Sequence, residues 1–212
     1  MKERPIIMNA ESVRAIIGGR KTQTRRVIKP QPPKGGRVSW LSKDTETKMA
    51  LDWAWWDALD RIGKCVNCPY GQPGDLLWLR ETWATTGNFD NYKPSELPLS
   101  HFSAESHLVY RATAKNSEPY YKWRPSIYMP RWASRITLRV TDVRVERVQE
   151  ISQEDARAEG CEPWHPKSNI PFRPEGSYRN AFHKLWDEIN AERGYSWSSN
   201  PWVWVVDFQV LT

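Results

Sequence analysis

Apolar residues recur along the 212-residue chain with two different periods. Helical spacing predicts amphipathic helices at 11–18 and 178–192, because apolar side chains there return every three or four residues. A shorter helix is predicted at 152–159, where Ser152 can cap the first turn and Gly160 can end the last. Alternating or continuous apolar runs predict strands near residues 6–8, 76–83, 108–113, 135–148 and 201–211.

The longest predicted strand contains a break in its alternation. Residues 136–140 place apolar side chains on one face, whereas Val143 and Val145 follow in the opposite phase. Because side chains alternate along a strand with a period of two, this slip predicts a β-bulge or a bend. A bend of this kind allows a strand to wrap around a small barrel.

Three segments lack a clean period and are predicted to be loop-rich insertions, at 38–67, 84–107 and 161–177. The first of them is rich in tryptophan. The length of the chain and its hydrophobic content of 39% suffice for one hydrophobic core. We therefore expect a single α+β domain over residues 1–212, with these segments as insertions.

Basic residues are concentrated in two segments of the chain, whose overall net charge is +6. Residues 1–37 carry ten basic and two acidic side chains, a net of +8, and residues 111–147 carry nine and three, a net of +6. Two basic segments that meet in the fold would attract a polyanion, most simply nucleic acid. The alternative is a solvated basic face without a partner.

The chain contains 13 tryptophans, and we expect most of them in the core because each buries a large apolar area. Trp78, Trp83 and Trp132 are candidates for stacking on a base, with core packing as the alternative. Glu81 is expected to pair with an arginine near the barrel mouth, Arg26 or Arg80. Arginines suit bidentate contacts with anions or carbonyl groups, and the charged residues considered for substrate or nucleic-acid binding are Arg20, Arg25, Arg26, Arg80, Glu81 and Arg131.

The stretch 18–26, Gly-Gly-Arg-Lys-Thr-Gln-Thr-Arg-Arg, combines charge with possible chemistry. Its cations alone favour a phosphate-binding surface. The Lys-Thr-x-Thr order also puts a hydroxyl close to an amine that could take its proton, which is one way to make a nucleophile. Neighbouring positive charge would disfavour the ammonium form of Lys21 and so favour this role.

The order of these elements resembles the ASCH domain, a PUA-like β-barrel superfamily linked to RNA. The resemblance is carried by a helix followed by Gly-Arg-Lys-Thr-x-Thr-x-Arg, a Gly-Asp turn into a strand, a long strand, and a short helix ending Ala-x-x-Glu-Gly. Motifs that look like those of a bacteriophage and prophage branch stand at 68–71, 78–83, 125–135 and 200–204. The barrel resemblance covers residues 4–30, 68–83, 108–160 and 200–211.

This resemblance implies an α+β fold built on a PUA-like mixed β-barrel. Some small bacterial members are amidohydrolases that remove the acetyl group from N4-acetylcytidine, and the residues matching their triad are Lys21, Thr24 and Glu159. The implied function is an amidohydrolase acting without a cofactor on an N-acylated cytosine, in a modified nucleoside or in RNA. The alternatives are a ribonuclease in the same basic cleft and a non-catalytic RNA-binding module, in which Lys21 and Glu159 form a structural ion pair.

Cysteine spacing gives a less specific pattern. Cys65-x-x-Cys68 is half of a zinc motif, and Cys161-x-x-x-His165 could complete a Cys3His set. Separate reduced thiols are the alternative. The chain has no apolar run long enough to cross a bilayer, and its first residues lack the apolar core of a signal peptide. We therefore expect a cytoplasmic protein with no membrane partner.

Overall fold

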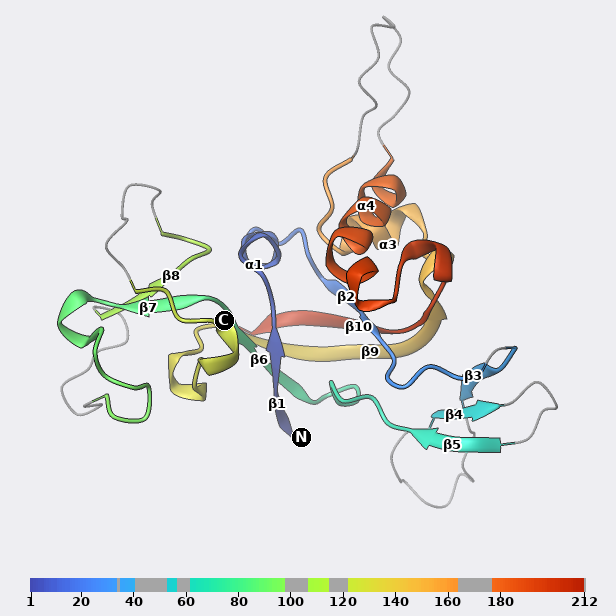
Figure 1. Cartoon of the computed structure of the whole chain (residues 1–212), viewed down its shortest axis with the longest axis horizontal. Helices are drawn as coiled ribbons and strands as arrows, with labels where there is room; N and C mark the ends of the chain where they lie inside the picture. Colours follow the sequence, from blue (N-terminus) through green and yellow to red (C-terminus); the bar gives the residue numbers. More distant parts are fainter. Residues whose placement is uncertain are drawn as a thin grey trace, which may run out of the picture.

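The computed structural model describes residues 1–33, 35–40, 53–56, 62–97, 107–114, 122–163 and 177–211. These residues form a mixed α+β structure around a five-stranded sheet (Figure 1). The strands of this sheet are β1 (Glu3–Ile7), β2 (Gln23–Val27), β6 (Leu76–Arg80), β9 (Thr137–Arg147) and β10 (Trp202–Leu211). The α-helices are α1 (Ala10–Ile17), α3 (Gln153–Ala158) and α4 (Tyr178–Asn190).

The main sheet has the strand order β1-β6-β9-β10-β2. Strands β1 and β6 run parallel, and the other neighbours pair antiparallel. The two edges, β1 and β2, do not pair with each other among the described residues, so the hydrogen-bonded sheet is open there. The α+β class is confirmed, whereas a closed barrel is not seen in the described part of the chain.

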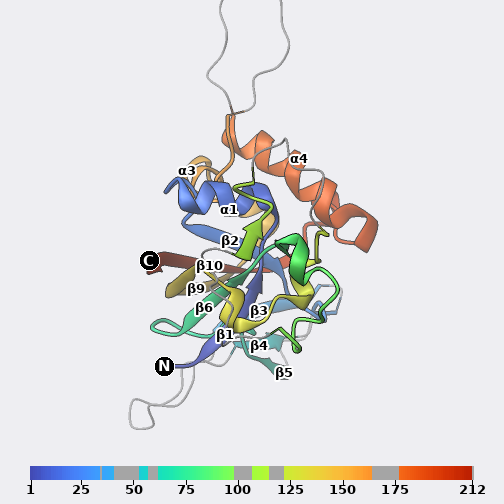
Figure 2. The same cartoon turned by 90° about the vertical axis from the view of Figure 1, so that its left-hand side faces the viewer.

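Both faces of the sheet are covered, as β10 illustrates. Trp204, Val206 and Phe208 point into an inner cluster that also contains Val13 and Ile16 of α1. Val203 and Val205 point the other way, into a helix-side cluster formed with Val148, Ile151, Ala156, Phe182 and Trp186. Helices α3 and α4 pack side by side over this second face (Figure 2). Both faces of β10 are therefore buried.

The predicted slip in the long strand is confirmed. The register between β9 and β10 shifts at Asp207/Phe208, where Asp207 pairs with Asp142 and Phe208 pairs with Val140. One extra residue of β9 is thereby accommodated, so that Val143 joins the inner cluster despite its changed phase.

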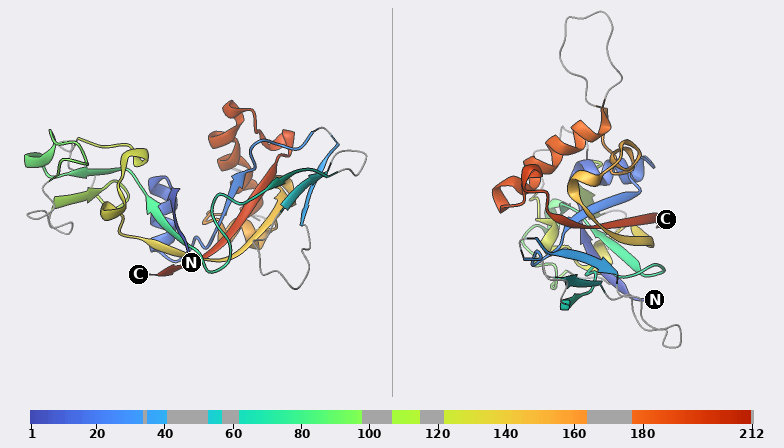
Figure 3. Two further views of the ribbon diagram at one scale, coloured as in Figure 1. Left: turned by 90° about the horizontal axis from the view of Figure 1, so that it is seen from below. Right: turned by 90° about the vertical axis from the view of Figure 1, so that its right-hand side faces the viewer.

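Two smaller sheets lie at opposite ends of the molecule (Figure 3). One is an antiparallel sheet of β3 (Arg37–Trp40), β4 (Trp53–Trp56) and β5 (Ile62–Val66), so the prediction of a loop-rich insertion at 38–67 is wrong in that this segment forms a sheet. The other pairs β7 (Trp83–Thr85) with β8 (Leu108–Tyr110). Short 3-10 turns are η1 (Gly87–Phe89), η2 (Ser126–Tyr128), η3 (Arg131–Ala133), η4 (Val148–Glu150), η5 (Ala191–Arg193) and η6 (Trp197–Ser199).

The predicted single strand over 76–83 is wrong, because the chain leaves the main sheet after Arg80 and joins β8 from Trp83. The junction holds Glu81, whose side chain is only 1% exposed and accepts hydrogen bonds from Arg135 Nε at 2.9 Å and Nη2 at 3.1 Å. Burial raises the pKa of the Glu81 carboxyl, and Arg135 opposes that rise. Glu81 therefore pairs with Arg135, not with Arg26 or Arg80 as the sequence suggested.

The helices agree closely with the sequence, with one correction. Helix α3 begins at the predicted cap, where the Asp155 backbone N–H donates to Ser152 Oγ at 3.0 Å. The apolar pattern puts Val13, Ile16 and Ile17 on one face of α1. Val13 and Ile16 are buried as expected, but Ile17 is 53% exposed and does not belong to that face. No helix in the described ranges has the length and apolar character needed to cross a bilayer.

Candidate functional site

The end of α3 meets the start of β2 at a close contact that glycine makes possible. Gly160 has φ +83°, and a Cβ on it would stand 2.9 Å from Ala15 Cβ and 3.0 Å from Lys21 Cβ. Lys21 and Glu159 consequently form an isolated β-bridge, and the Thr22 N–H donates to the Ala158 carbonyl at 2.8 Å. The backbone thus holds the two predicted acid–base residues next to each other.

Lys21 and Glu159 form a buried ion pair, with side chains that are each 5% exposed. Lys21 Nζ donates to Glu159 Oε2 at 2.5 Å and to the Glu159 carbonyl oxygen at 2.8 Å. The other carboxylate oxygen, Oε1, is buried without a hydrogen bond, and Arg25 Nη1 lies 3.6 Å from it. The predicted proximity of Lys21 and Glu159 is therefore confirmed.

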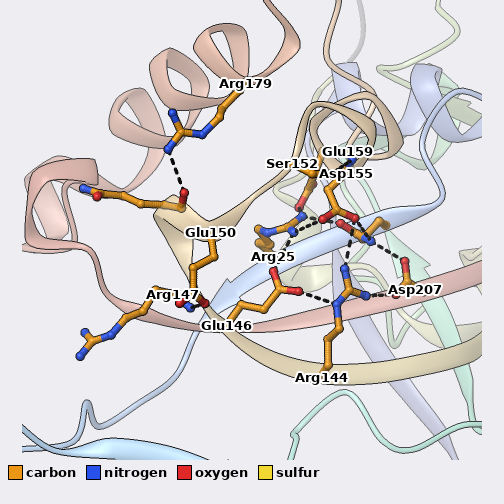
Figure 4. Close-up of polar contacts among 12 residues, drawn as sticks. Arg25, Arg144, Glu146, Arg147, Glu150, Ser152, Asp155, Glu159, Arg179 and Asp207 are labelled. Carbon is orange, nitrogen blue, oxygen red and sulfur yellow. Dashed lines mark hydrogen bonds and ion pairs between the residues drawn. The ribbon is translucent and has the colours of Figure 1, made fainter.

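Arg25 connects this pair to a polar network behind the site (Figure 4). Its side chain is fully buried, and Nη2 lies 3.0 Å from Glu146 Oε2 and 3.2 Å from Asp155 Oδ2. Nη1 also donates to Gln23 Oε1. Because a buried guanidinium needs compensating charge, these carboxylates explain how Arg25 can lie under α4, with its guanidinium 5.8 Å from the centre of the Phe182 ring.

A second arginine, on β9 two strands away from β2, completes the network. Arg144 donates to Glu146 Oε1 at 2.6 Å, to Asp155 Oδ1 at 3.1 Å, and to Asp207 Oδ2. Gln23 Nε2 donates to Asp155 Oδ1 at 3.0 Å and to Asp207 Oδ1 at 2.6 Å. Burial disfavours ionisation of Asp155, but the hydrogen bond from Gln23 and the charges of both arginines outweigh it and lower the Asp155 pKa.

A cavity of about 640 Å³ lies along β2, and the ion pair forms part of its wall. Lys21, Thr24 and Glu159 all line it, together with Arg25 and Arg26. Its size falls within the range of small-molecule sites. All three members of the predicted triad therefore share one cavity, as the sequence predicted.

Arg26 crosses the gap between the two edge strands of the sheet. Its Nη2 donates to the Ile7 carbonyl oxygen at 2.5 Å and lies 3.3 Å from Met8 Sδ. Its Nε is buried without a hydrogen-bond partner in the structure. Arg26 also lines the cavity, so its guanidinium is held at the cavity wall by these contacts.

Thr24 is buried, with 4% of its surface exposed. Lys21 Nζ makes both of its hydrogen bonds to Glu159, and none joins Lys21 to Thr24. In this structure the amine is engaged by the carboxylate rather than by the hydroxyl. The Thr24 hydroxyl would thus need a substrate or a water molecule between it and the ion pair.

Most of the other predicted binding residues lie elsewhere. Arg20 pairs with Glu162 and lines a neighbouring cavity of about 370 Å³. The Arg80 guanidinium lies 5.3 Å from the centre of the Trp78 ring, and Arg80 Nη2 donates to the Ile127 carbonyl oxygen. Neither Trp78 nor Arg80 lines the larger cavity.

Three further candidates have structural partners. Arg131 makes a bidentate contact with Glu3, at 3.0 and 3.2 Å. Trp83 is completely buried, and Trp132 packs edge-on against it at 6.0 Å between ring centres. Both rings belong to a cluster with Leu97, Leu108, Met129 and Ala133, so Trp83 is a core residue and not a stacking surface.

Sequence reasoning missed the wall that α4 contributes to the cavity. Phe182, Leu185, Trp186, Ile189 and Asn190 line it, followed by Arg193 and Tyr195 beyond the helix. The pattern had assigned the apolar members of this face to the core. The sequence signal that could have indicated this wall is the length of the apolar face of α4, which continues to Ile189. In the structure Ile189 is 41% exposed, so this end of the face is not core.

The predicted zinc set is not assembled in the described residues. Cys68 packs against the inner cluster and Cys161 against the helix-side cluster, and burial raises their pKa values to about 12 and about 11. His165 lies outside the described residues, as does the side chain of Cys65. The described part of the chain contains no group of three His, Cys, Asp or Glu residues arranged to hold a metal ion.

No family model, curated protein or solved structure matches this chain. The relationship to the ASCH superfamily therefore stays a prediction from the residues.

Proposed function

We propose that this protein is an amidohydrolase that removes an acyl group from N4-acylated cytidine or a similar modified base. The observation that carries the proposal is the buried Lys21–Glu159 ion pair in the wall of a cavity that Thr24 also lines. An amine and a carboxylate that share a short hydrogen bond can exchange a proton with little movement. A buried pair of this kind next to a cavity is a candidate acid–base centre.

The proposed reaction uses one water molecule. With its proton passed to Glu159, Lys21 accepts a proton from the nucleophile, which attacks the acyl carbon. Glu159 then gives its proton to the leaving amine nitrogen as the C–N bond breaks. The nucleophile is either a water oriented by Thr24 or the Thr24 hydroxyl itself, and in the second case water hydrolyses the acyl-threonine ester afterwards.

Arg26 is the proposed donor to the acyl oxygen. Arg26 lines the cavity together with Lys21 and Thr24, and a guanidinium stabilises the negative charge that develops on a carbonyl oxygen under attack. A PUA-like fold of the ASCH superfamily is part of the same proposal. It is supported by the order of the elements along the chain.

The deciding experiment incubates the protein with N4-acetylcytidine and reads the products by mass spectrometry. We expect cytidine and acetate, no turnover by Lys21→Ala, and a loss of about 10²–10⁴ in rate for Glu159→Gln, which keeps the shape but not the proton. Lys184→Ala, an exposed lysine of α4 outside the cavity, is the matched control and should keep the wild-type rate. Folding of each variant is checked by thermal melting.

Thr24→Val separates the two nucleophiles. If Thr24 is acylated, the wild type shows an acetyl adduct on intact-protein mass spectra under rapid quench, and the valine variant shows neither adduct nor turnover. If Thr24 orients water, no adduct forms and the variant keeps reduced turnover. Wild-type protein that leaves N4-acetylcytidine intact, or folded Lys21→Ala protein that deacylates it at the wild-type rate, contradicts the proposal.

A non-catalytic RNA-binding module is the second candidate, favoured by the mutual neutralisation of Lys21 and Glu159. Incubation with single-stranded RNA in the same assay tests it, and shortened RNA would indicate a ribonuclease instead.

A further inference from the structure

The cavity is longer than the reactive centre, because β2 and α4 run beside each other along it. At one end the Arg25 guanidinium lies 5.8 Å from the centre of the Phe182 ring, close to Glu159. At the other end Lys29 Nζ lies 5.4 Å from the centre of the Tyr195 ring. Lys29 follows Arg25 by four positions, two residues beyond the end of β2, which places their Cα atoms up to about 13 Å apart. The cavity therefore has a second end away from the ion pair.

Local structure beyond α4 fixes this second end. Gly194, with φ +82°, ends the η5 turn and redirects the chain. The Tyr195 N–H then donates to the Asn190 carbonyl at 3.1 Å, and the Tyr195 carbonyl accepts from Trp186 Nε1 at 2.8 Å. Because Trp186 is buried in the helix-side cluster, Tyr195 has a defined position at the cavity wall.

The charge of the cavity lining is unbalanced at this end. Glu159 is the one carboxylate among the described lining residues, and it is engaged by Lys21. Arg25 is compensated from behind by Glu146 and Asp155. The cations that face the cavity without a carboxylate within ion-pair distance, among the residues that the structure describes, are Arg26, Lys29 and Arg193.

We propose that Lys29, Arg193 and Tyr195 form a phosphate subsite, so that the cavity takes a phosphorylated nucleoside or a single-stranded oligonucleotide. A lysine and an arginine supply charge and donors to phosphate oxygens, and the tyrosine hydroxyl is a further donor. The apolar wall of α4 between the two ends offers a surface for a base or sugar. This inference rests on the proposed function for the identity of the base, whereas the phosphate subsite itself requires no turnover.

The experiment measures binding rather than catalysis. Cytidine, cytidine 5′-monophosphate, inorganic phosphate and a fluorescently labelled single-stranded oligocytidylate are titrated against the full chain at several salt concentrations. We expect the phosphorylated ligands to bind at least tenfold more tightly than cytidine, with affinity falling as salt rises. Preference for the oligonucleotide over the monophosphate would assign the subsite to a backbone phosphodiester, and the reverse preference to a terminal phosphate.

The double variant Lys29→Gln/Arg193→Gln should weaken binding of the phosphorylated ligands at least tenfold. Its slope of log affinity against log salt should fall by about 2, one for each lost cation contact. The charge-matched control Arg157→Gln/Lys184→Gln removes two exposed cations outside the cavity and should bind as the wild type does. Both pairs lie at the surface, and thermal melts confirm that the variants fold.

Equal binding of cytidine and its monophosphate, or equal losses in the two double variants, would overturn the subsite. Failure of the proposed function is a separate result. In that case acylated cytidine is not hydrolysed, while the preference for phosphate and its loss in the Lys29/Arg193 variant can still be measured.

Discussion

Arg25 and Arg26 are neighbours in the chain, yet their surroundings are opposite. Arg25 is fully buried and faces the carboxylates of Glu146 and Asp155 on the α3 side of β2. Arg26 points to the other side, where it contacts the Ile7 carbonyl and lines the cavity without a carboxylate partner among the described residues. The alternation of a β-strand thus divides a run of like charges into a structural cation and one that faces a ligand site.

This division changes how the basic stretch is interpreted. Counted along the sequence, the cations of residues 1–37 suggest a single polyanion-binding surface. In the structure several of them, and several from 111–147, are neutralised by acidic partners within the fold. These internally paired arginines are Arg20, Arg25, Arg131, Arg135 and Arg144. Internal pairing therefore removes part of the charge that the totals suggest is available to a ligand.

The largest expected effect compares the two arginines directly. Arg25→Met should lower the free energy of unfolding by about 3–5 kcal/mol, because it removes one partner from a buried ionic network. Arg26→Met should cost about 1 kcal/mol, the net value of an ordinary hydrogen bond. Urea unfolding followed by tryptophan fluorescence measures both. Equal losses would contradict the assignment of structural and ligand-facing roles.

The next effect tests the contact that places Lys21 beside α3. Gly160→Ala imposes a left-handed backbone on alanine, which costs about 1–2 kcal/mol, and brings its Cβ to 2.9 Å from Ala15 Cβ. Gly194→Ala is the matched control, because Gly194 has nearly the same φ but nothing within 4 Å of an added Cβ.

The difference between the two variants, measured by the same urea unfolding, isolates the crowding. We expect Gly160→Ala to be the more damaging by about 1–3 kcal/mol, the usual cost of overpacking. If the two glycine variants lose the same stability, the close approach of α3 and Lys21 is not under steric control.

Local patterns predicted much of this arrangement correctly. The Ser152 cap, the bulge in β9 and the amphipathic face of α1 follow from periods and caps within a few residues. The pairing of Lys21 with Glu159 was predicted from the resemblance together with the direct passage from the long strand into a short helix. Each of these features depends on neighbours in sequence or on one strand-to-helix connection.

The rest depends on partners that are distant in sequence. The polar residues 80–82 interrupt the apolar pattern of 76–83, but they do not reveal that the chain changes sheets there, because the partner of Glu81 is Arg135, 54 residues away. Stacking surfaces and core tryptophans have the same local pattern, so Trp83 was misassigned. The cavity wall could not be derived either, because it needs α4 to lie beside β2 across 150 residues of chain.

The smallest effect is a difference in acid sensitivity between the two sides of β2. The pKa of Asp155 is lowered from its ordinary value of 3.8 in the folded protein. Its ionised form therefore contributes stability that is present above that value and lost as the pH falls through the folded pKa. Asp155→Asn removes the group, and the free energy of unfolding should then fall less steeply between pH 5 and 2, values typical of acid unfolding.

Two controls connect this pH dependence to the network around Arg25. Asp142→Asn removes another carboxylate near Arg144, which is 58% exposed and 3.8 Å from it, and this variant should leave the pH profile close to that of the wild type. Arg26→Met should do the same, because no described carboxylate pairs with Arg26. A profile flattened equally by Asp142→Asn and Asp155→Asn would mean that the acid sensitivity belongs to the general charge of the surface and not to the buried side of β2.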